Sequence, residues 1–366
     1  MGDFAFNLPI NQVSFGQVSY GLLKETFNRS INPCVFPIGE VNLSTQKEPS
    51  KEFQEWLEFC INKANRSHSR DTPTVRLWHI FDSLQSYSKE QTLLTFYELD
   101  SPTEQEVNVL NNNDVVVTSK FAQEVFKGVG VESRYAPLFF DKENFQVTKN
   151  EDGETKRYFD DGRITFNLAG KFEKRKHHYK AIKAWLKKFG DDKKYFLQAC
   201  VYNNFFSQEQ NVQMFQSCTE GKRYFNVNFL NYMPTNELYN DYLNSSDIII
   251  GMSGGEGWGL PEFHSIGLGK HGVILNAHSY KDWANQDNSI LVEPKEEKIE
   301  VYDETFFKRG APFNQGNIYD FDEDEFIAAC EEAVKKVESN RVSEAGFKIQ
   351  EDFTVSKTLD SLLEGV

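Results

Sequence analysis

The sequence lacks most of the features that mark membrane, secreted or metal-binding proteins. No stretch approaches the roughly 20 consecutive apolar residues that a membrane-spanning helix requires. The opening residues MGDFAFNLPINQ have neither a basic region nor a long apolar region, so no signal peptide is expected. The five cysteines are scattered without a CxxC pair, which favours small core residues in a reducing compartment over a disulfide or zinc framework. We therefore expect a cytoplasmic protein.

Positive charge is also scarce. The chain of 366 residues has 40 Lys and Arg against 55 Asp and Glu, a net charge of -15. This balance argues against a general attraction to nucleic acid or to anionic membranes, although it is compatible with a local basic site. The hydrophobic content of 39% is enough for a sizeable core, and the length suits two domains of ordinary size.

Glycine is concentrated in one stretch, between Asp247 and Pro294. Residues 247–251 form a β-branched apolar run that predicts a buried strand. The next seven residues after Met252 are SGGEGWG, whose four glycines permit a sharply turned loop. Leu260-Pro261 opens a predicted helix, and residues 271–275 form another buried strand. This βαβ unit presents a helix N-terminus, which is a favourable site for an anion.

The segment Glu256-Gly257-Trp258-Gly259-Leu260-Pro261 resembles the donor-site signature of retaining GT-B glycosyltransferases with a Glu-x7-Glu motif. The resemblance implies that Glu256 lies near the donor hexose. At the second Glu of the motif, which would hold the nucleotide ribose, this chain has His264, whose imidazole can still hydrogen-bond two hydroxyl groups. The other donor-binding residues that the resemblance implies here are Gly255, Gly257, Trp258, Gly259 and Leu260.

The first part of the chain alternates predicted strands with helices, which indicates a parallel sheet. Its loop 11–16 resembles the first glycine loop of GT-B enzymes, so Gly16 is expected beside the donor phosphates or the acceptor. Ligand sites lie at the carboxyl ends of parallel strands, and this rule selects His79 and the Tyr97–Glu98 pair. Relatives often have a His facing the donor anomeric carbon where this chain has Tyr97–Glu98. His79 is the candidate for that role, and a structural histidine is the alternative.

The predicted strand 164–169 is followed by the basic loop GKFEKRK. The family has Gly-Arg or Gly-Lys here and a Lys five or six residues later, so the resemblance implies that Lys171 and Lys176 bind the donor diphosphate, with Arg175 beside them. Fixed cations would stabilise the charge of the leaving diphosphate. A solvated basic loop is the alternative. We expect no metal site and metal-independent chemistry, because the acidic run 320–325 is explained by its position before a helix.

The predicted fold class is α/β of the GT-B type, with two Rossmann-like domains facing an inter-domain cleft. Residues 1–155 are expected to form the N-terminal acceptor domain, together with a C-terminal crossing helix at 345–366. Residues 156–344 are expected to form the donor domain. The polar, charged segment 147–163 is the predicted linker.

The predicted activity is retaining transfer of a sugar from a nucleotide-diphosphate sugar to a hydroxyl of a glycan, lipid or small molecule, with no other cofactor. One alternative is a phage DNA glycosyltransferase acting on a 5-hydroxymethylated pyrimidine in the host cytoplasm, because SGGEGWGLPEFHS, WHIFDS and GKFEKRKHHYKAIKAW resemble phage-encoded transferases. The basic helix 177–189 would then contact DNA phosphates. The other alternative, suggested by His264, is a non-catalytic relative that binds sugar nucleotides.

Overall fold

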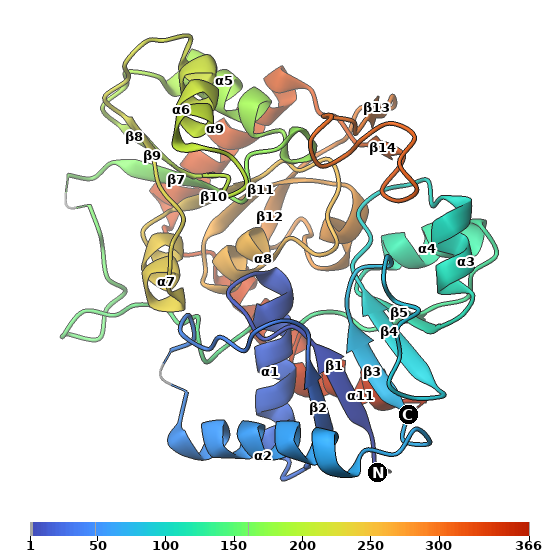
Figure 1. Ribbon diagram of the computed structural model, residues 1–366. Coiled ribbons are helices and arrows are strands. Elements are labelled where there is room, and N and C mark those ends of the chain that lie inside the picture. Colours follow the sequence, from blue (N-terminus) through green and yellow to red (C-terminus); the bar gives the residue numbers. More distant parts are fainter. Residues whose placement is uncertain (1–2, 48, 160, 366) are drawn as a thin grey trace.

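The computed structural model describes residues 3–47, 49–159 and 161–365, which form two lobes (Figure 1). Each lobe contains a parallel sheet that has six strands within the described residues. Such strands are buried on both faces, which explains the uninterrupted apolar runs 115–117 and 248–250. The predicted α/β architecture with two Rossmann-like halves is confirmed.

The first lobe has the strand order β2-β1-β3-β4-β5-β6. Its strands are β1 (Ala5–Leu8), β2 (Cys34–Pro37), β3 (Thr74–Leu77), β4 (Gln91–Thr95), β5 (Asp114–Val117) and β6 (Arg134–Tyr135). Its helices are α1 (Ser14–Asn28), α2 (Lys51–Ser67), α3 (Glu104–Leu110) and α4 (Lys120–Gly128). The last helix of the chain, α11 (Val355–Leu363), also packs against α1, where Arg29 pairs with Asp360 at 2.5 Å.

The second lobe has the strand order β12-β11-β10-β7-β8-β9. Its strands are β7 (Ile164–Ala169), β8 (Tyr195–Cys200), β9 (Val227–Phe229), β10 (Ile248–Gly251), β11 (His271–Leu275) and β12 (Ser289–Val292). Its helices are α5 (His178–Phe189), α6 (Gln208–Thr219), α7 (Asn236–Asn244), α8 (Leu260–Gly267) and α9 (Glu323–Ser339), with short 3-10 turns η1 (Lys174–Lys176) and η2 (His278–Asp282). Among the helices that the described ranges contain, none is long and apolar enough to cross a membrane.

Two predicted elements differ from the structure. The strand predicted to reach Ile80 ends at Leu77, so His79 lies in the loop that follows β3. The crossing helix predicted over 345–366 is divided into η3 (Glu344–Lys348), α10 (Ile349–Asp352) and α11. The division occurs because the Thr354 hydroxyl accepts from the backbone N–H of Lys357 and thereby caps a new helix.

A hairpin from the second half of the chain is built into the first lobe. Its strands β13 (Ile299–Glu300) and β14 (Asn317–Ile318) pair antiparallel, and Figure 1 shows the hairpin beside α3 and α4. Its residues Val301, Phe307 and Ile318 share a hydrophobic cluster with the first lobe. The Asn317 N–H donates to Asp100 at 2.8 Å, and Lys298 pairs with the same carboxylate at 3.0 Å. The hairpin 299–318 therefore ties the two lobes together.

Candidate active site

A cavity of about 310 Å³ lies between the lobes. The first lobe contributes the loop before α1 and the first turns of that helix, and the second lobe contributes the loop after β7 and the first turn of α8. The carboxyl ends of the strands in both sheets point toward this region, as the topology of parallel sheets requires. The residues that line the cavity include Ser14, Gln17, Gly170, Lys171, Phe205, Leu260 and His264.

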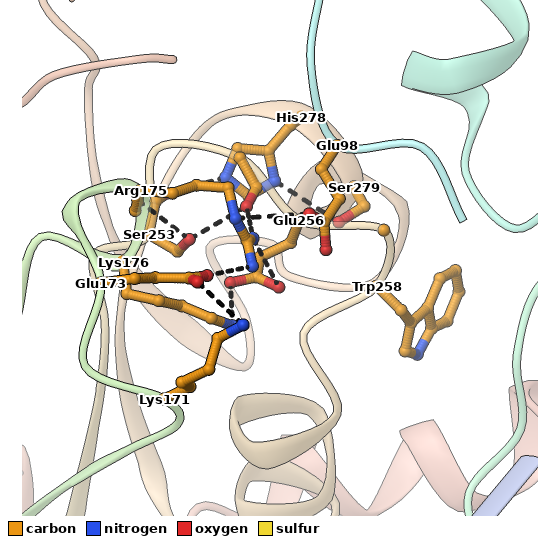
Figure 2. A network of polar contacts seen from close by, with 12 residues as sticks. Glu98, Lys171, Glu173, Arg175, Lys176, Ser253, Glu256, Trp258, His278 and Ser279 are labelled. Carbon is orange, nitrogen blue, oxygen red and sulfur yellow. Dashed lines mark hydrogen bonds and ion pairs between the residues drawn. The ribbon is translucent and has the colours of Figure 1, made fainter. Parts of the chain in front are cut away.

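Beside the cavity, charged side chains from both lobes form one network, which Figure 2 shows around Arg175. The Arg175 guanidinium contacts Glu173 at 2.6 Å, Glu98 at 3.3 Å and Glu256 at 3.4 Å. Lys176 pairs with Glu256, and Lys171 pairs with Glu173 at 3.0 Å. We call these six residues the ion network. Its three cations and three carboxylates balance in charge.

Burial and pairing set the protonation of this network. Burial alone would raise the pKa of Glu256, but the ion pairs with Lys176 and Arg175 lower it well below its usual range. Burial would lower the pKa of Arg175, and its carboxylate neighbours raise it. Burial raises the pKa of Glu98, and nearby Glu256 and Glu173 add to this effect against the attraction of Arg175. Glu256 is therefore ionised at neutral pH, and Glu98 is the network carboxylate that takes up a proton most readily.

The structure brings four of the predicted site residues together and leaves His79 apart from them. Lys171, Arg175, Lys176 and Glu256 meet in the ion network. The exposed His79 ring instead packs between two aromatic rings of the first lobe. Packing among these rings, and then the charge of Lys171, lower the pKa of His79.

His264 lines the cavity from α8. Its ring is 4% exposed, packs 4.3 Å from the Phe145 ring and hydrogen-bonds the Leu260 backbone. Burial lowers the pKa of His264 to about 3, so the imidazole is neutral. Its Nε2 has no hydrogen-bond partner among the described residues. A buried polar atom without a partner is costly, which makes this nitrogen a candidate ligand contact.

The glycines of the loop after β10 permit close packing between the lobes. A Cβ on Gly255 would lie 2.4 Å from the Glu98 carbonyl oxygen, and one on Gly257 would lie 2.6 Å from the Cβ of Phe96. The Thr118 hydroxyl donates to the Gly257 carbonyl at 2.8 Å. These contacts give the two glycines a packing role between the lobes, whether or not they also contact a donor.

The remaining predicted donor residues have different positions. The Trp258 side chain is 2% exposed and packs on Phe263 and Phe353, and Figure 2 shows it directed away from the ion network. Gly259 has φ +86° and begins α8. Gly16 lies in α1, where a Cβ would lie 2.1 Å from a backbone oxygen of the preceding loop. Leu260 lines the cavity.

Glu173 and His278 were not predicted from the sequence, whereas Glu98 belongs to a pair that was selected. Glu173 was not singled out, although it lies within the basic loop. Of the Tyr97–Glu98 pair, only Glu98 reaches the network, because Tyr97 is buried against Phe126. His278 supports the glycine loop, since its Nε2 donates to the Ser253 carbonyl at 2.8 Å. The acidic residue within the basic segment KFEKRK after Gly170 is the sequence pattern that could have indicated Glu173.

The predicted basic face of helix 177–189 is largely neutralised. His177 and His178 are buried and do not belong to that face, which corrects the prediction. Three lysines of α5 are paired with carboxylates of the same lobe, and the pairs are Lys180–Asp320 at 2.7 Å, Lys183–Glu220 at 2.9 Å and Lys188–Glu331 at 2.5 Å. Within the described ranges, no group of three or more His, Cys, Asp or Glu residues is arranged to hold a metal ion.

Comparison with solved structures identifies the architecture. The chain matches HepE of Anabaena in complex with UDP and glucose with a TM-score of 0.67 at 11% identity, over 100% of this chain and 99% of that one. It matches sucrose-phosphate synthase from Thermosynechococcus elongatus with a TM-score of 0.63 at 12% identity, over 98% and 96%. It matches WaaG, a glycosyltransferase involved in lipopolysaccharide biosynthesis, with a TM-score of 0.61 at 10% identity, over 99% and 100%.

The chain has the GT-B fold. This likeness extends over both lobes, so the predicted GT-B architecture is confirmed. No protein-family model matches the sequence, and no curated protein matches it significantly. In this GT-B chain the ion network and the cavity lie where the two sheets face one another.

Glu262 lies on the side of α8 that faces β10, and its protonation should make the stability of the protein depend on pH. It is 3% exposed, and burial raises its pKa to about 7 from an ordinary value of 4.5. A carboxyl whose pKa is raised by folding stabilises the protein below pH 4.5, and this contribution is lost as the pH rises through 7. Glu262→Gln, which stays neutral, should unfold like the wild type at pH 5. At pH 8 it should be more stable by a few kcal/mol, on the scale of about 1.4 kcal/mol per pKa unit.

Urea unfolding of both proteins at the two pH values measures this difference. Glu237→Gln, at an exposed position on α7, is the control and should change little at either pH. Equal stability of wild type and Glu262→Gln at pH 8 would contradict the assignment of a protonated carboxyl.

Proposed function

We propose that this protein transfers a sugar from a UDP-sugar to an acceptor hydroxyl with retention of the anomeric configuration. The observation that supports the proposal best is the meeting of Lys171, Lys176 and Glu256 in one network beside the cavity between the lobes. UDP is the proposed nucleotide because HepE, which has the same fold, binds UDP and UDP-glucose in its solved structures.

In this proposal the diphosphate lies between the loop after β7 and the N-terminus of α8. Lys171 and Lys176 neutralise its charge as the bond to the sugar breaks, which lowers the barrier to transfer. In the structure these lysines pair with Glu173 and Glu256. The carboxylates thus fix the positions of the two lysine side chains and balance their charge. The lysines are therefore already placed to bind an anion.

We assign Glu256 to the hydroxyl groups of the donor sugar. Its ion pairs keep it charged, and a charged carboxylate is a strong hydrogen-bond acceptor for hydroxyl groups. The acceptor hydroxyl attacks from the face that the diphosphate leaves, and its proton passes to the leaving phosphate. This route differs from the carboxylate double displacement of retaining glycosidases. No divalent metal is needed to neutralise the leaving group in this scheme.

The DNA and non-catalytic alternatives have less support. The net charge of -15 opposes binding of a polyanion, and the lysines of α5 named above are paired away from the cavity between the lobes. A sugar-nucleotide-binding protein without activity would bind donor and leave it intact. Turnover therefore separates the proposal from that alternative.

Glu256→Gln tests the activity. This substitution keeps the size of the side chain, whereas Glu256→Ala would leave two buried cations without their partner and destabilise the fold. Release of UDP from UDP-sugars should fall by at least about 100-fold, the scale of losing an electrostatic contact in the transition state. Glu331→Gln removes an exposed carboxylate from a surface pair and should keep the wild-type rate. A folded Glu256→Gln protein with the wild-type rate would rule out this role.

Lys171→Ala/Lys176→Ala tests the diphosphate site. Calorimetric affinity for UDP should fall by about 2 kcal/mol or more, roughly 30-fold, because charge-assisted hydrogen bonds are lost. The control Lys187→Ala/Lys193→Ala removes the same net charge at exposed positions of the second lobe. If the two double variants lose equal affinity, the effect is one of net charge and the assigned site is wrong.

His264 is the proposed ribose contact, through its unpartnered Nε2. Wild type should bind UDP more tightly than 2′,3′-dideoxy-UDP by about 1–3 kcal/mol, because the modified ligand leaves the buried nitrogen unpaired. His264→Ala should bind both nucleotides equally, and His264→Glu should recover part of the preference. If folded His264→Ala keeps the full preference, the ribose is held elsewhere and His264 packs the interior only.

A further inference from the structure

A row of packed rings runs along the first lobe and ends at the hairpin 299–318. Phe15 stacks on Phe96 with a centroid distance of 4.5 Å and packs on His79 at 4.6 Å. His79 stacks on Phe81 at 5.3 Å with an interplanar angle of 11°. Phe313 of the hairpin 299–318 meets Phe81 edge-on at 6.2 Å. We call these five side chains the ring row.

The ring row runs from the interior to the surface. Phe15 is 9% exposed at the inner end, whereas Phe81 is 37% exposed at the outer end and His79 is also exposed. On the same loop Leu84 is 59% exposed. The core packing of the lobe does not require rings in solvent, and a contiguous exposed apolar surface beside a cleft is typical of a binding site.

Aromatic rings of the second lobe flank the cationic end of the donor site. Lys171 Nζ lies 3.9 Å from the centroid of Phe306 and 5.1 Å from that of Phe205. Phe306 belongs to the same hairpin as Phe313, so the hairpin 299–318 contacts both Lys171 and the ring row. The ring row and the proposed donor site are thus neighbours along this hairpin.

The charges around the ring row do not suit a polyanion. The loops 78–90 and 301–316 together contain three cations, Lys89, Lys308 and Arg309, against four carboxylates, Asp82, Glu90, Asp303 and Glu304. Two of the cations are already paired, Lys89 with Asp71 at 2.5 Å and Arg309 with Glu300 at 2.6 Å. A nucleic acid gains its affinity from cations that replace its counterions, and these loops offer few.

We propose that the ring row is the acceptor platform and that the acceptor is a neutral sugar ring, the terminal unit of a glycan. This inference rests on the transferase function proposed above and specifies its substrate class. The C–H face of a pyranose is apolar and packs on aromatic rings, while its hydroxyl edge needs hydrogen-bonding groups. The neutral imidazole of His79 supplies one donor and one acceptor in the middle of the row.

Saturation-transfer NMR with maltose, cellobiose and diacetylchitobiose, in the presence of UDP, tests the inference. At least one disaccharide should bind, with the strongest signals from one face of a single ring. Phe81→Ala should weaken this binding by about tenfold, the size of one lost ring contact, and Phe81→Tyr should restore it. Phe313→Ala, at the other end of the contact, should also weaken it. Phe225→Ala removes a ring that is 58% exposed in the second lobe and should have no effect.

Calorimetry with UDP on the same proteins separates this inference from the proposed function. Affinity for UDP should be equal in wild type and all four variants. Failure of wild type to bind UDP would overturn the transferase proposal itself. Intact UDP binding without disaccharide binding, or disaccharide binding that Phe81→Ala does not change, would overturn the acceptor inference alone. Binding of a single-stranded oligonucleotide with 5-hydroxymethylcytosine in place of the disaccharides would also overturn it.

Discussion

The guanidinium of Arg175 is surrounded by carboxylates that follow three different strands, and the shape of the cleft depends on this contact. Glu173 follows β7, Glu256 follows β10, and Glu98 comes from the other lobe after β4. A buried cation without partners would cost several kcal/mol, so the fold has to bring these strand ends together. The same network holds Lys176 and also Lys171, which lines the cavity. The ion network is thus a structural joint between the lobes as well as the proposed donor site.

The closeness of the lobes is maintained by packing as well as by charge. Side chains at Gly255 and Gly257 would collide with the backbone and Cβ atoms of residues 96–98. The hairpin 299–318 adds a hydrophobic cluster shared with the first lobe. Any opening of the cleft therefore has to separate Glu98 from Arg175 while the hairpin keeps its packing against the first lobe. This arrangement restricts how far the two sheets can move apart.

Helix α8 presents buried polar groups on two sides, and the two have different explanations. His264 faces the cavity with a neutral ring and an unpartnered nitrogen, which a ligand hydroxyl would satisfy. Glu262 faces β10 and packs against Gly251 and Gly259, and its Oε2 is buried without a hydrogen-bond partner among the described residues. A protonated carboxyl avoids the cost of a buried charge there. One short helix thus combines a candidate recognition group with a pH-sensitive structural group.

The sequence by itself determined the α/β architecture with two sheets, most strand positions and several of the charged residues that meet beside the cavity. The strands at 164–169 and 271–275 match their predicted bounds, since buried parallel strands are continuous apolar runs between turns. Lys171, Lys176 and Glu256 were selected by local motifs and do meet in space. Only the tertiary structure decided the partners of Arg175, the inward turn of Trp258, the hairpin contact and the ring row. These features depend on residues that are far apart in the chain and become neighbours when the sheets face one another, and local periodicity contains no information about such contacts.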